Sequence, residues 1–171
     1  MLVDRYLKQY PEREPYHWQR GIAYYYAGQF EKGVQQFEIH RTVNPQDVEN
    51  AIWHYLCRAR VDGIKAAQKG LIEITRDRRP WAMPVYRMYQ GRTTPDDLLT
   101  QTQQRGGSDD EQRINLFYAH LYVALFFDAQ GDTEKTQRFL TAAVRTYPCD
   151  HYMGDVARVH LQRIASASES H

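Results

Sequence analysis

Proline and glycine recur along this chain at a fixed spacing. The prolines Pro11, Pro45, Pro80 and Pro148 stand 34, 35 and 68 residues apart, and a glycine precedes three of them by 17 residues, at Gly28, Gly63 and Gly131. A period of about 34 residues, with a turn glycine halfway and a proline at the close, is typical of stacked helix-turn-helix pairs. The sequence therefore predicts an all-α repeat protein.

The repeat phase predicts a single helical domain over residues 1–165, followed by a tail at 166–171. Its units are expected at residues 14–47, 49–82, 83–116 and 117–150. The third unit is degenerate, because Asp97 and Ile114 occupy the expected glycine and proline positions. The second helix of the second unit is expected to carry Ala66, Ala67, Leu71 and Ile72.

Local signals mark further boundaries inside this domain. Thr94 is expected to cap a helix that has Pro95 in its first turn, and Gly91 is expected to end the helix before it. The polar, glycine-containing stretch 103–111 is expected to be a loop.

Both ends of the domain are expected to be helical. Residues 2–10 are interpreted as the leftover second helix of an incomplete unit. Asp150 is placed to cap a closing helix over residues 151–164, which covers the end of the stack. Its inward face is expected to consist of Tyr152, Met153, Val156, Val159 and Ile164.

The units resemble the tetratricopeptide repeat family. The first unit matches the family's small, aromatic, turn and closing positions at Gly21, Tyr24, Gly28, Phe30, Gly33, Phe37 and Pro45. The second keeps Gly63 and Pro80, and the last keeps Ala124, Phe127, Gly131, Leu140, Ala143 and Pro148. The resemblance implies a right-handed superhelix of antiparallel helix pairs, whose first helices line a concave groove.

Mapped by this resemblance, the partner-binding positions of the groove are Trp18, Ile22, Tyr25, Tyr26, Trp53, Arg60 and Tyr118. A groove rich in rings suits an apolar or amphipathic peptide, because rigid rings bury a large area with little loss of rotamer entropy. The same rings could instead pack within a short, tightly curled array, and both interpretations stay open. The expected function is a non-catalytic scaffold or adaptor that binds a peptide or helix of a partner protein and needs no cofactor.

A second resemblance concerns residues 50–145. Trp53 to Leu56, Arg87 to Gly91 and the helix around Phe117 are similar to the later repeats of bacterial outer-membrane lipoprotein adaptors. That resemblance implies a dimeric scaffold that recruits hydrolases or proteases. A homodimer is therefore left open, and membrane attachment is not carried over, because the lipid-bearing cysteine is not in this chain.

Two other functions compete with the scaffold. His54 and Cys57 are three residues apart on one helix, which suits either a thiol activated by imidazole or two metal ligands. Tyrosines interleaved with arginines suggest stacking on unpaired RNA bases. However, 22 Lys plus Arg face 21 Asp plus Glu, and this balance argues against nucleic acid as a partner.

The two cysteines, Cys57 and Cys149, form neither a C-x-x-C motif nor a disulfide framework. No stretch of the sequence approaches the roughly 18 to 20 apolar residues of a membrane span. The cytoplasm is the favoured compartment. A trimmed exported protein stays open, since Tyr10-Pro11 is typical of the end of a unit whose beginning is absent.

Overall fold

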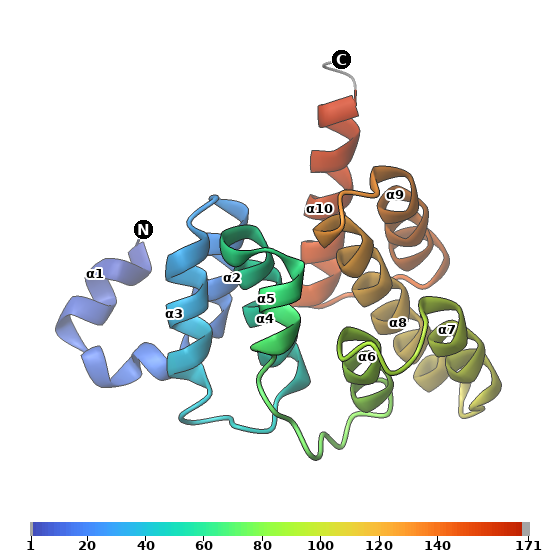
Figure 1. Cartoon of the computed structure of the whole chain (residues 1–171), viewed down its shortest axis with the longest axis horizontal. Helices are drawn as coiled ribbons and strands as arrows, with labels where there is room; N and C mark the ends of the chain where they lie inside the picture. The colour runs from blue at the N-terminus through green and yellow to red at the C-terminus, as the bar shows by residue number, and fades with distance from the viewer. Residues whose placement is uncertain (1, 169–171) are drawn as a thin grey trace. The chain divides into compact units, whose positions relative to one another are not determined.

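The computed structural model describes the backbone of residues 2–168 and the side chains of residues 4–166. These residues form helices joined by short irregular segments, and no strand occurs among them (Figure 1). The predicted all-α class is confirmed. The chain divides into two compact units, the first ending at Arg78 and the second beginning at Arg79. The single domain over residues 1–165 stays a prediction.

The first unit consists of α1 (Leu2–Gln9), a 3-10 helix η1 (Pro11–Tyr16), α2 (Trp18–Tyr26), α3 (Phe30–His40), α4 (Val48–Asp62) and α5 (Ile64–Lys69). α2 packs on α3 and α4, α3 packs on α4, and α4 packs on α5. Small residues permit this close approach: a Cβ added at Gly21 would lie 2.5 Å from Phe37 Cζ, and one at Gly33 would lie 2.5 Å from Cys57 Sγ. The helix pairs therefore meet at two of the small positions identified in the sequence.

The three predicted turn glycines all have left-handed backbones, with φ of 71° at Gly28, 86° at Gly63 and 78° at Gly131. Residues other than glycine disfavour this backbone region because they carry a Cβ. Each glycine lies between the two helices of a pair, as predicted. The repeat spacing therefore located these turns correctly.

The segment after α5 differs from the prediction. Leu71 and Ile72 lie beyond the last residue of α5, in an irregular stretch rather than on a helix. Gln46 Oε1 accepts hydrogen bonds from Thr75 N, Thr75 Oγ1 and Arg76 N at 2.9, 3.0 and 3.0 Å. These bonds satisfy the backbone without a helix, so a side chain distant in sequence outweighs the local helical pattern.

Asp77, at the end of the same segment, contacts the start of α4. The Val48 amide donates to Asp77 Oδ2 at 3.1 Å, and Asp47 Oδ1 accepts from the Glu49 amide at 3.0 Å. The first amides of a helix have no partner within the helix. Two carboxylates therefore cap α4, one local and one from 29 residues further along the chain.

The second unit consists of α6 (Ala82–Tyr89), α7 (Pro95–Gln104), α8 (Asp109–Ala129), α9 (Thr133–Thr141), a π-helical turn η2 (Ala142–Thr146) and α10 (Tyr152–Ser168). α6 and α7 pack on α8, α8 packs on α9, and α9 packs on α10. The middle of α8, from Asn115 to Leu125, is buried except for His120. α8 is therefore the central helix of this unit.

Capping confirms one predicted helix start and reveals another. Thr94 Oγ1 accepts from the Asp97 amide at 3.1 Å, and Pro95 is the first residue of α7, as predicted. The predicted loop over residues 103–111 is wrong at both ends, because α7 continues to Gln104 and α8 begins at Asp109. α8 also begins before the predicted unit 117–150, because Ser108 caps it in a second capping box with Glu111.

Replacing Ser108 by alanine should lower the free energy of unfolding by about 1 kcal/mol, the usual cost of losing an N-cap hydroxyl. Hydrogen bonds from the backbone and side chain of Ser108 lower the pKa of Glu111 below its usual 4.5. The stabilisation from Glu111 is therefore present above that value and is lost as pH falls through the lowered pKa. Urea unfolding at several pH values measures both effects. A Glu111→Gln variant, which keeps an acceptor oxygen, should lose the pH dependence and keep most of the stability.

The closing helix forms, with two corrections. The Met153 amide donates to His151 Nδ1 at 3.2 Å, so His151, not Asp150, caps the start of α10. Tyr152 and Val159 were expected to face inward, but they are exposed, whereas Met153 and Val156 are buried. One face of α10, which includes Tyr152 and Val159, therefore faces solvent, and the opposite face, which includes Met153 and Val156, is covered.

The predicted tail at 166–171 starts too early, because α10 continues through Ser168; residues 169–171 lie outside the described part of the chain. Among the described residues, no helix combines the length and apolar character needed to cross a membrane.

Candidate functional site

Two helices of the first unit bring several predicted groove residues into one cluster. The Trp53 ring of α4 has its centroid 5.4 Å from that of Tyr25 and 6.2 Å from that of Tyr26, both on α2. Arg60 of α4 donates from Nη2 to the Tyr25 hydroxyl at 3.4 Å. The rings meet edge-on or tilted, as their quadrupoles favour. We call Tyr25, Tyr26, Trp53 and Arg60 the α2/α4 cluster.

Burial divides the predicted groove residues of this unit into two groups. Trp53 is only 1% exposed, and Ile22 and Tyr25 are also buried. Trp18 and Tyr26 are half-buried, and Arg60 is exposed. A partner contacts accessible atoms, so Trp18, Tyr26 and Arg60 are the predicted groove residues of this unit that are accessible to a partner. The role of this surface in binding stays a prediction.

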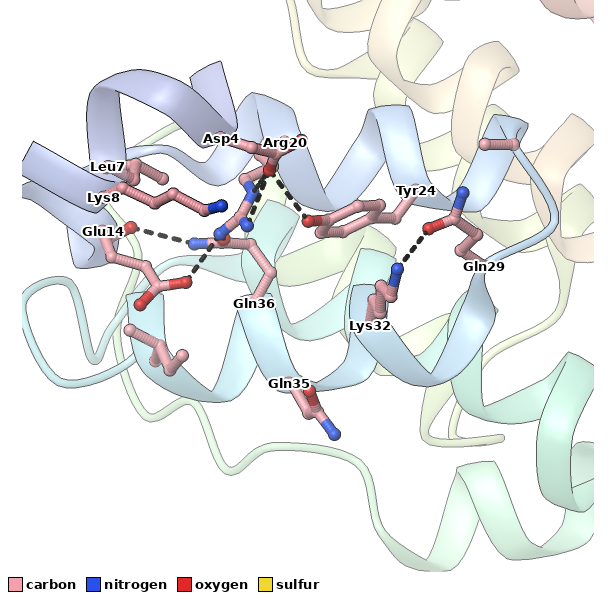
Figure 2. Close-up of a pocket in the computed structure, with 12 residues that line it drawn as sticks. Asp4, Leu7, Lys8, Glu14, Arg20, Tyr24, Gln29, Lys32, Gln35 and Gln36 are labelled. Atoms are coloured by element: carbon pink, nitrogen blue, oxygen red, sulfur yellow. Dashed lines mark hydrogen bonds and ion pairs between the residues drawn. The ribbon is translucent and has the colours of Figure 1, made fainter. Parts of the chain in front are cut away.

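A cavity of about 730 Å³ lies in the first unit, with walls from α1, η1, α2 and α3 (Figure 2). Arg20 Nε and Nη2 donate to Asp4 Oδ1 at 3.1 and 2.9 Å, and Nη1 donates to Glu14 Oε1 at 2.6 Å. The Tyr24 hydroxyl also donates to Asp4 Oδ1, at 3.4 Å. We call this the Arg20 cavity.

The charge of Arg20 is balanced within the unit. Burial acts to lower the pKa of Arg20, but hydrogen bonds with Glu14 and Asp4 outweigh burial and raise it. Gln36 adds an acceptor oxygen 3.2 Å from Nη1 and donates to the Glu14 carbonyl at 3.0 Å. A guanidinium held by two carboxylates has little attraction left for an anionic ligand. Arg20 therefore acts as a structural tie from α2 to α1 and η1.

Tyr118, the remaining predicted groove residue, lines a cavity of about 480 Å³ in the second unit. Its ring stacks on Trp81, with the centroids 4.0 Å apart and the planes 7° from parallel. The Arg79 guanidinium lies over the Trp81 ring, 4.8 Å from its centroid, and the Tyr118 hydroxyl lies 3.2 Å from His151 Nε2. We call this the Trp81 cavity.

Polar groups line the rest of the Trp81 cavity. Arg105 Nη1 donates to the Pro80 backbone carbonyl at 2.7 Å. This is the one hydrogen bond that the Arg105 guanidinium makes to the described residues. Asn115 is only 5% exposed, and its amide makes no hydrogen bond within the described part of the chain. The cavity thus combines stacked rings, which bury apolar groups, with donors that have capacity for a polar ligand.

The competing pair on α4 has a different environment. His54 and Cys57 are both buried, and His54 Nε2 lies 3.5 Å from Glu38 Oε1. Burial raises the pKa of Cys57 to about 12. A reactive cysteine needs a lowered pKa and access to its substrate. No group of three or more His, Cys, Asp or Glu side chains suited to a metal ion occurs within the described residues.

Cys57 should react slowly with iodoacetamide at neutral pH. With a pKa of about 12, fewer than roughly one thiol in ten thousand is ionised at pH 7.4. Mass spectrometry should find alkylation of Cys57 at least about a hundredfold slower in the folded protein than in urea. Rapid labelling of the folded protein at neutral pH would restore the His54/Cys57 alternative.

Comparison with known families finds no matching family model, and no curated protein matches the chain. The resemblance to the tetratricopeptide repeat therefore depends on the positions quoted from the sequence.

The sequence prediction included Tyr118 but none of the other residues that line the Trp81 cavity. The sequence prediction assigned no site role to Arg79 or Asn115. Trp81 and Tyr118 are far apart in sequence, and helical spacing relates only residues on the same helix. The one local sign of this site in the sequence was a cationic residue, Arg79, and an aromatic residue, Trp81, on either side of the closing Pro80.

Proposed function

We propose that this protein is a non-catalytic helical scaffold of the tetratricopeptide type, and that it binds a segment of a partner protein. The observation that carries the proposal is the Trp81 cavity, a concave site with stacked rings and unused hydrogen-bonding groups. Ligand sites of proteins are commonly concave, largely apolar and supplied with a few polar groups that fix orientation.

The order of the helices supports the tetratricopeptide part of this proposal. In the first unit, the pair α2 and α3 is followed by α4 and α5, and a left-handed glycine stands between the helices of each pair. α2 also packs on α4, so the first helices of successive pairs are in contact. In repeat proteins each unit buries its apolar face against its neighbour, and the contact between α2 and α4 supports such an arrangement for the first unit.

The α2/α4 cluster supports a second surface for the same partner class. Its buried rings contact the accessible residues Tyr26 and Arg60. Rigid aromatic side chains lose little conformational entropy on binding. We therefore keep Trp18, Tyr26 and Arg60 as the accessible part of the predicted groove.

Affinity capture from the native cell lysate tests the function with three variants. Ile114→Trp adds bulk to a half-buried residue that lines the Trp81 cavity, and Ile39→Trp is the matched change in the Arg20 cavity. A third variant replaces Trp18, Tyr26 and Arg60 by alanine. Circular dichroism first establishes that each protein is folded.

Partners lost with Ile114→Trp and retained with Ile39→Trp would support the Trp81 cavity as the binding site. Loss only with the alanine variant would move the site to the predicted groove. Identical captured proteins from all four samples would contradict the binding proposal.

A further inference from the structure

We propose that the Trp81 cavity recognises an acidic side chain within an extended segment of the partner. In this inference, which rests on the proposed function, Arg105 binds the carboxylate and Asn115 binds the adjoining peptide group. Charge, hydrogen bonding and the continuity of the site each support one part of it.

The charges that line the Trp81 cavity favour an anion. Arg79 and Arg105 contribute guanidinium groups, whereas Glu111 is the one acid in the lining. Glu111 Oε2 accepts from Ser108 N at 3.0 Å and from Ser108 Oγ at 2.9 Å, so two guanidinium groups in the lining are opposed by one carboxylate. Arg105 gives one of its five N–H donors to Pro80 and pairs with no described acid. A carboxylate can therefore form charge-assisted hydrogen bonds with this guanidinium.

Asn115 supplies the second observation. A buried amide normally has hydrogen-bond partners, because leaving it without any costs free energy. The Asn115 side-chain amide has no hydrogen-bond partner among the described residues; 95% of the residue is covered, but its polar atoms are not fully buried, and it lines the Trp81 cavity. An amide offers one acceptor and two donors, which match the N–H and C=O of a peptide group. Its chemistry therefore fits a polypeptide backbone.

The site continues past Arg105, which favours an internal segment over a chain end. A neighbouring cavity of about 330 Å³ shares Pro80, Trp81, Arg105 and Asn115 with the Trp81 cavity. An extended chain advances about 3.3 Å per residue, so a few residues can occupy both cavities.

Selection from phage-displayed random dodecapeptides, joined to the coat protein by their C-termini, tests this inference. The most enriched peptide is then synthesised with both ends blocked, and its Kd is measured by fluorescence anisotropy. We expect enriched peptides to carry Asp or Glu. Changing the acid to its amide, or Arg105→Gln in the protein, should each weaken binding about tenfold or more.

Arg92→Gln is the matched control, because Arg92 is exposed and lies outside both cavities while the charge change is the same. It should change the Kd less than twofold. Asn115→Leu should raise the Kd of the acidic peptide and the Kd of the peptide with the amide in place of the acid by the same factor. The reason is that this substitution removes only the contact with the peptide backbone.

Three results would overturn the inference: enrichment of peptides without acids, an unchanged Kd with Arg105→Gln, or failure to enrich any peptide from this library, whose members have no free terminal carboxylate. The capture experiment would still decide the proposed function, because it does not depend on the charge of the ligand.

Discussion

Replacing Trp53 by alanine is expected to lower the free energy of unfolding by about 3–5 kcal/mol, the usual range for truncating a buried tryptophan. Trp53 is 1% exposed, and its ring contacts those of Tyr25 and Tyr26. Alanine removes these contacts and leaves a cavity that the surrounding helices can fill only in part. Urea unfolding followed by circular dichroism measures the loss.

Trp53→Phe is the informative companion. Trp53 Nε1 is buried without a hydrogen-bond partner among the described atoms, and an unsatisfied buried donor costs about 1–3 kcal/mol. Phenylalanine keeps a ring and removes this donor, so it should cost much less than alanine. Tyr16→Ala, at a 61% exposed position, should change stability by less than about 0.5 kcal/mol. Equal stability of Trp53→Ala and wild type would contradict the packing described for the α2/α4 cluster.

This result also determines how binding should be tested. A variant with alanine at Trp53 or Tyr25 loses core packing, so a lost partner would report unfolding as readily as a lost contact. Changes at Trp18, Tyr26 and Arg60 alter accessible atoms. Only such variants can separate recognition from stability.

Replacing Gly154 by alanine is expected to cost about 2–3 kcal/mol or more, because the added Cβ would collide with a backbone carbonyl. Gly154 lies in the first turn of α10, and the obstructing atom is the carbonyl oxygen of Cys149. A backbone atom cannot move aside as the end of a side chain can. The segment from Cys149 to His151, which borders the Trp81 cavity, would have to shift.

Gly70→Ala is the control for this substitution. An added Cβ at Gly70 would meet Arg58 Nη1 at 2.6 Å, which is the end of a long, flexible side chain. Gly70→Ala should therefore be close to neutral, and the difference between the two variants in urea unfolding isolates the collision. If both variants lost the same stability, the collision at Cys149 would not be the cause.

Local patterns predicted much of the fold. The turn glycines, the start of α7 at Thr94-Pro95 and the all-α class follow from backbone preferences that act within a few residues. The early start of α8 could also have been predicted from the sequence, because Ser108 and Glu111 have the spacing of a capping box. The polar residues between them were instead interpreted as a loop.

Tertiary contacts explain what the sequence could not predict. α5 ends at Lys69 while Gln46 holds the backbone of Thr75 and Arg76, and no local pattern identifies that partner. The tetratricopeptide resemblance assigned Trp53 and Tyr25 to the groove, but the spacing of apolar residues along a helix cannot tell a covered face from an open one. The Trp81 cavity depends on residues from several segments and was missed for the same reason.

The bonds around Gln46 and Asp77 also bear on how the first unit opens. Gln46, in the loop before α4, accepts hydrogen bonds from the Thr75 and Arg76 amides. Asp77, in the segment after α5, accepts one from the Val48 amide at the start of α4. Neither stretch can detach without breaking bonds made by the other. The two stretches therefore form one cooperative opening element, and the amide protons of Val48, Thr75 and Arg76 should exchange with solvent in the same event.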